Sequence, residues 1–69
     1  MDDPGAIPVR IGLNSGMVVL ARMNGVDQRL LYSRAMRRDH EFMEVEGLNG
    51  RQVYVRPSAV DCLEINPEL

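Results

Sequence analysis

The sequence is poor in the residues that build large cores and reactive sites. Among 69 residues it has no tryptophan, two tyrosines, one phenylalanine, one cysteine and one histidine. A single cysteine cannot close an intramolecular disulfide, and a single histidine cannot complete a Cys/His zinc site. No stretch approaches the roughly 20 apolar residues of a membrane-spanning helix. We therefore expect no metal, no cofactor, no membrane and no catalytic site.

What remains is a short aliphatic chain, 45% hydrophobic, which predicts one domain over residues 1–69 with a small core. Residues 1–8 carry acids, prolines and a glycine, and we expect them to form a flexible tail. A secretory signal would need a positive region followed by an apolar run there, so we expect a cytoplasmic protein. Because a chain of this length is marginally stable alone, association with a second subunit is one remedy.

Charge is divided between the two halves of the chain, and every cation is arginine. Residues 9–38 hold six arginines and one acid, whereas residues 39–69 hold two arginines and seven acids. Such a chain can pair its own halves, stack head to tail with a copy of itself, or present a basic face to an anionic partner.

The first third of the chain predicts a β-hairpin over residues 8–23. Val9, Ile11 and Leu13 alternate with polar or small residues, as in a strand with one buried face. A turn over residues 14–16 precedes the nearly unbroken apolar run 17–21. An apolar run bounded by turn residues predicts a central strand covered on both faces.

Residues 9–16, Val-Arg-Ile-Gly-Leu-Asn-Ser-Gly, with Val18 and Val19, resemble a segment of class III adenylyl and guanylyl cyclase catalytic domains. In that family the segment is a hairpin within a ferredoxin-like core. The metal-binding aspartate pair that precedes it, and the later block ending in asparagine and arginine, have no counterpart here. The resemblance implies the hairpin and not the nucleotide chemistry.

Asn24-Gly25 predicts a tight turn, because both residues tolerate the positive φ of a type I′ turn. Residues 28–38 fit a helix, with Leu31 and Ala35 four positions apart, or a strand, in which apolar and polar residues sort poorly. Leucine, arginine, alanine and methionine favour the helix. We expect a helix, with a strand as the alternative.

The second half predicts another hairpin, with strands over residues 41–46 and 51–56 joined by Gly47-Leu48-Asn49-Gly50. Pro57 ends the second strand, residues 58–60 make one helical turn, and residues 62–65 form a short strand. The predicted fold class is mainly β (α+β): a small curled antiparallel sheet or partly open barrel, SH3/Sm-like in size, with one short helix.

Residues 42–67 resemble the small flagellar proteins called FlbD. The likeness is carried by Val45, Leu48-Asn49-Gly50, Val55, Pro57, Val60 and Leu63-Glu64. In that family a hairpin on a Leu-Asn-Gly turn leads to an Asn-Pro step and a short returning strand. Arg56 stands where the family usually has asparagine, and two later strands have no counterpart. The resemblance implies a small β fold.

Cys62 and His40 are the candidates for a thiol nucleophile and its base, a pair that needs hydrogen-bond reach. Cys62 lies between Val60 and Leu63, where cysteine is usually a small buried hydrophobe. His40 lies among charged residues at the end of an element. We expect neither to be catalytic.

Two functions remain. The first is a non-catalytic protein-interaction module that acts as a small homo-oligomer or as a subunit of a larger assembly, with five methionines as adaptable contact residues. The alternative is a small nucleic-acid-binding module that uses an arginine-rich helix face, to which Arg29 would also belong. The candidate contact residues are Arg34, Arg37, Arg38 and Tyr32.

Overall fold

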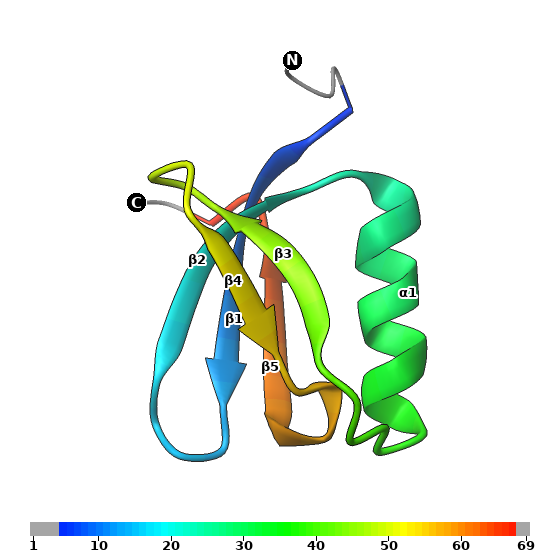
Figure 1. The fold of residues 1–69 in the computed structure, drawn as a ribbon. Helices are drawn as coiled ribbons and strands as arrows, with labels where there is room; N and C mark the ends of the chain where they lie inside the picture. The colour runs from blue at the N-terminus through cyan, green and yellow to red at the C-terminus, as the bar shows by residue number, and fades with distance from the viewer. Residues whose placement is uncertain (1–4, 68–69) are drawn as a thin grey trace.

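The computed structural model describes residues 5–67, which form one five-stranded sheet and one helix (Figure 1). The elements are β1 (Ile7–Leu13), β2 (Val18–Met23), α1 (Gly25–Met36), β3 (Met43–Gly47), β4 (Gln52–Val55), the 3₁₀ turn η1 (Pro57–Ala59) and β5 (Val60–Ile65). Every neighbouring pair of strands is antiparallel, in the order β4-β3-β2-β1-β5. The predicted α+β class is confirmed; within residues 5–67 the sheet does not close into a barrel.

The first hairpin is confirmed, and β2 is the central strand of the sheet, as predicted. The predicted coverage of both faces of β2 is wrong. Ala21 and Met23 are buried, whereas Val18 is 55% and Leu20 39% exposed. The helix packs on the inner face, and in the described part of the chain no second layer covers the outer one.

The turn between β1 and β2 depends on a glycine in the left-handed region. Leu13 N–H donates to Met17 O at 2.9 Å, and Gly16 N–H donates to Leu13 O at 2.9 Å. Gly16 has φ +94°, a backbone conformation that residues with a side chain rarely adopt. This arrangement is typical of a type I turn followed by a one-residue bulge.

The turn between β3 and β4 has the same construction. Gly47 N–H donates to Arg51 O at 2.7 Å, Gly50 N–H donates to Gly47 O at 2.9 Å, and Gly50 has φ +84°. Asn49 Oδ1 also accepts from Arg51 N–H at 3.1 Å. The second predicted hairpin is therefore confirmed, with slightly shorter strands than expected.

Asn24-Gly25 does not form the predicted turn. Asn24 is the N-cap of α1, and its Oδ1 accepts from Asp27 N–H at 2.8 Å. Gly25 is the first helical residue and has no positive φ. Asparagine favours an N-cap as strongly as it favours a turn, because its short side chain satisfies an unpaired N–H at the helix start. The expected helix is confirmed, but it begins at Gly25 rather than Gln28 and ends at Met36 rather than Arg38.

Alanine substitutions should distinguish a glycine at positive φ, Gly50, from a glycine in the helix, Gly25. Gly50→Ala should lower the free energy of unfolding by about 1–2 kcal/mol, because a Cβ at positive φ is strained although nothing lies within 4 Å. Gly25→Ala should be neutral or stabilising by up to about 1 kcal/mol, since alanine favours the helix. Urea unfolding measures both changes. A destabilised Gly25→Ala chain would contradict the assignment of Gly25 to α1.

The last strand is where the sequence indicates it, preceded by one helical turn, although β5 starts at Val60 rather than Cys62. It pairs with β1 from Val9↔Ile65 to Leu13↔Val60, with a bulge between Gly12 and Leu13. The first and last strands of the sheet, which are far apart in the sequence, therefore lie side by side. Of the predicted tail, residues 1–4 lie outside the described residues, and Ile7 and Pro8 already belong to β1.

The core is aliphatic and lies between the inner face of the sheet and α1. Its buried residues come from four strands and the helix: Val9, Ile11, Ala21, Met23, Leu31, Met43, Val45 and Val55. Leu31 is the one buried residue of α1 and is fully enclosed. A single side chain therefore anchors the helix in the core.

Candidate interaction surface

Arg34, the first predicted contact residue, lies in the last turn of α1 and bonds to residues that follow the helix. Its Nε donates to Asp39 Oδ2 at 2.9 Å, and its Nη2 donates to Glu41 O at 2.9 Å. Only 15% of the Arg34 side chain is exposed. The arginine fixes the turn that follows the helix, so little of its guanidinium remains for a partner.

Asp39 is the acid at the centre of this turn. Its Oδ1 accepts from Glu41 N–H at 2.9 Å. That bond first, and then the Arg34 guanidinium, holds the pKa of Asp39 below its ordinary value of 3.8. The carboxylate is therefore the form that the fold binds, and protonation weakens the turn.

Stability should consequently fall in acid. A carboxyl whose pKa is lowered by folding contributes stability above its unfolded pKa and loses it as the pH falls through its folded pKa. We expect the free energy of unfolding to decline below about pH 4, and Asp39→Asn to flatten that decline. Urea titrations from about pH 6 to about pH 2 measure both slopes. Glu44→Gln is the control, because the exposed Glu44 side chain has no hydrogen bond or ion pair within residues 5–67; an unchanged slope in Asp39→Asn would contradict the account.

The other three predicted contact residues are exposed at the C-terminal end of α1. Arg37 and Arg38 follow the last helical residue, and Arg38 turns the chain with φ +55°. Tyr32 is 61% exposed on the last turns of the helix. Tyr32, Arg37 and Arg38 are therefore accessible to a partner, whereas the Arg34 side chain is occupied by contacts within the chain.

Tyr32 belongs to an apolar groove of about 280 Å³ between α1 and β5. Its walls are Leu31, Tyr32, Ala35, Met36, Val60, Asp61, Cys62 and Leu63. Met36 is 67% exposed beside Tyr32. Apolar side chains of α1 and β5, which are distant in sequence, therefore lie together at the surface. The pattern of apolar residues along the sequence did not reveal this groove.

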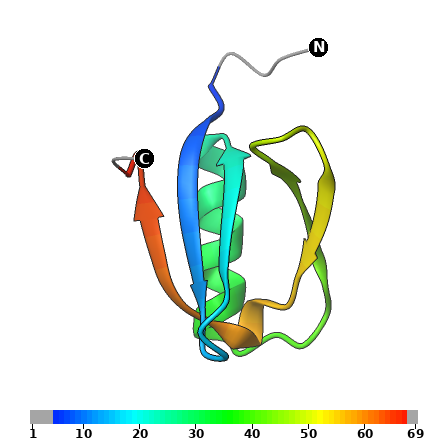
Figure 2. The same ribbon diagram turned by 90° about the vertical axis from the view of Figure 1, so that its left-hand side faces the viewer.

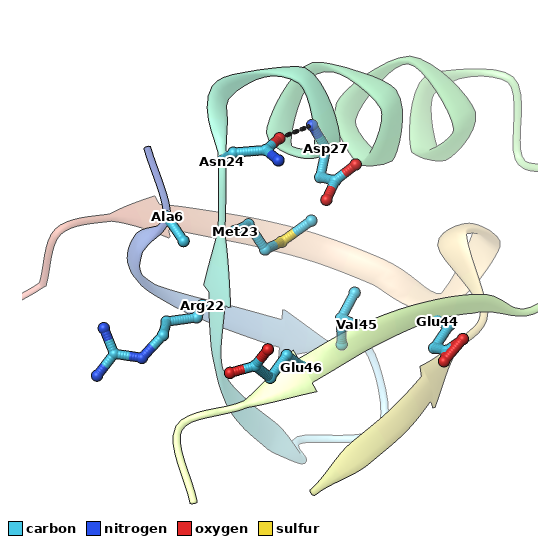
Figure 3. Close-up of a pocket in the computed structure, with 8 residues that line it drawn as sticks. All are labelled: Ala6, Arg22, Met23, Asn24, Asp27, Glu44, Val45 and Glu46. Carbon is cyan, nitrogen blue, oxygen red and sulfur yellow. Dashed lines mark hydrogen bonds between the residues drawn. The ribbon is translucent and has the colours of Figure 1, made fainter. Parts of the chain in front are cut away.

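A more polar pocket of about 190 Å³ lies where β2 passes into α1 beside β3 (Figure 3). It is lined by Ala6, Arg22, Met23, Asn24, Asp27, Glu44, Val45 and Glu46. Of these residues, Met23 and Val45 are buried, and Asp27 N–H donates to Asn24 Oδ1 at 2.8 Å (Figure 3). Within residues 5–67 no group of three or more His, Cys, Asp or Glu side chains is placed to hold a metal ion.

Cys62 is exposed on β5, so the expectation of a buried thiol is wrong. Cys62 pairs with Gly12 of β1 and is one of the residues that line the groove between α1 and β5. His40 Nδ1 lies 3.0 Å from Ser58 Oγ. In the described chain no hydrogen bond joins His40 to Cys62.

Comparisons with family models, curated proteins and solved structures found no match for this chain. The α-helix of residues 5–67 has twelve residues and is too short to span a membrane.

Proposed function

We propose that the chain is a non-catalytic protein-interaction module, acting as a small homo-oligomer or as a subunit of a larger assembly. The cytoplasmic location expected from the sequence belongs to the same proposal. One observation carries it: α1 buries only Leu31 and leaves its other large apolar side chains in solvent.

These exposed side chains form two pairs with helical spacing. Tyr32 and Met36 lie four residues apart at the groove, 61% and 67% exposed. Val26 and Leu30 lie four residues apart elsewhere on the helix, 67% and 43% exposed. Large apolar side chains that are exposed in pairs, rather than singly, are typical of a protein-binding surface. Tyrosine and methionine suit such contacts because they offer large or adaptable apolar area.

A photo-cross-linking amino acid at Tyr32 tests the proposal. We expect a covalent adduct on irradiation: a multiple of 7.8 kDa with the purified chain indicates a homo-oligomer, and a defined heavier product in cells indicates a subunit. The same probe at Ser33, exposed but outside the groove, is the matched control. Absence of any adduct specific to position 32 would contradict the proposal.

The alternative function is nucleic-acid binding through Tyr32, Arg37 and Arg38. Their joint exposure at one end of α1 favours it, and the loss of Arg34 to an internal ion pair weighs against it. Fluorescence anisotropy with single-stranded RNA at low salt decides between the two. We expect no binding; an affinity that falls steeply with salt and disappears in Arg37→Gln with Arg38→Gln would establish the alternative.

A further inference from the structure

The sheet has two open edges, and they lie on opposite sides of the molecule (Figure 2). Within the described chain β4 pairs with β3 alone, and β5 pairs with β1 alone. An edge strand leaves a row of main-chain N–H and C=O groups without a sheet partner, which is a template for another strand. Each edge therefore offers half of a strand pair.

The two edges carry opposite charge. β4 is flanked by Arg51 and Arg56 and contains no charged residue itself. β5 carries Asp61 and Glu64 and no cation. Both arginines and both acids are exposed. Both edges come from the acidic second half of the chain, and its two arginines, Arg51 and Arg56, flank β4, so one edge is basic and the other acidic.

Each edge keeps at least one charge that the fold does not neutralise. Within residues 5–67, Arg51 and Asp61 form no ion pair. Glu64 lies 3.5 Å from Arg10, and Arg56 lies over the ring of Phe42 at 4.7 Å. The fold therefore gives Arg56 and Glu64 a contact within the chain, whereas within residues 5–67 it gives Arg51 and Asp61 no charged partner.

We propose that the basic edge β4 of one copy pairs with the acidic edge β5 of a second copy. This inference rests on the proposed function and names the partner as the chain itself. Pairing two β4 edges would oppose arginines, and pairing two β5 edges would oppose carboxylates, both of which are unfavourable. Only the β4–β5 combination brings opposite charges together.

The contact is heterologous, because different surfaces of the two copies meet. Such contacts close into rings or extend into open chains. β4 has only four residues, so each contact is small and partly electrostatic. The affinity should therefore be low, so that only a small fraction of the chains associates at low concentration, and it should decrease with added salt.

Light scattering at increasing concentration, in low and high salt, tests the pairing with two charge reversals. Wild type should exceed 7.8 kDa at low salt. Arg51→Glu and Asp61→Arg should each raise the dissociation constant about tenfold or more, because an attraction becomes a repulsion. Arg29→Glu, the same charge change at an exposed helix residue, should associate like wild type.

Mixing the two reversed variants supplies the decisive arm. In the mixture the intact β4 edge of Asp61→Arg meets the intact β5 edge of Arg51→Glu, and the two reversed edges also attract each other. Association should therefore return although neither variant associates well alone. A wild type that stays at 7.8 kDa, an Arg51→Glu chain that associates normally, or a mixture that fails to recover would each overturn the pairing. If the Tyr32 adduct still forms with another protein in any of these cases, the proposed function stands and only the edge pairing fails.

Discussion

Replacing Leu31 by alanine should lower the free energy of unfolding by about 2–5 kcal/mol. Leu31 is fully buried and is the one side chain that anchors α1 in the core. A chain of this length is typically stable by only about 3–10 kcal/mol, so the variant should lose much of its folded population. Thermal and urea unfolding at low protein concentration measure the loss.

Leu30→Ala is the matched control, since it removes the same atoms from the neighbouring position of the same helix. Leu30 is 43% exposed, so its truncation should cost less than about 1 kcal/mol. Equal losses in the two variants would show that α1 does not dock through Leu31.

Ile11→Ala should produce the second large loss, again about 2–5 kcal/mol, with Ile11→Val costing about 0.5–1.5 kcal/mol. Ile11 is fully buried in the middle of β1, between Val19 of β2 and Leu63 of β5. Its truncation opens a cavity where three strands meet. Urea midpoints of the two variants give the graded series.

Val18→Ala serves as the control for Ile11→Ala, because each change truncates a β-branched residue of the same hairpin to alanine. Val18 is 55% exposed on the outer face, and its loss should stay within about 0.5 kcal/mol. If Ile11→Ala cost no more than Val18→Ala, the core would not lie on the inner face of β1.

The features that the sequence predicted correctly are those decided by neighbouring residues. Strict alternation at Val9, Ile11 and Leu13 indicates a strand, and Gly16 and Gly50 mark the turns where φ is positive. The Asn24-Gly25 assignment failed because the same dipeptide suits a turn and a helix start. Asp27 favoured the helix start, because an acid in the first turn interacts favourably with the helix dipole.

The features that escaped prediction depend on contacts between distant segments. Pairing of β1 with β5 joins opposite ends of the chain, and no local pattern specifies it. The apolar run in β2 predicted two covered faces, yet its outer face lacks a second layer in the described chain. The candidate contact Arg34 was lost to Asp39, because Arg38 turns the chain back toward the helix. The charges at β4 and β5 can be read from the sequence, but only the strand order shows that β4 and β5 are the edges of the sheet.

Backbone resonance assignment with nuclear Overhauser contacts tests the fold most directly, and with it every surface proposed above. The account predicts helical shifts over residues 25–36 and contacts between β1 and β5 at Ile11 and Leu63. Extended shifts over residues 25–36, or contacts that place another strand beside β1 at Leu63, would contradict it.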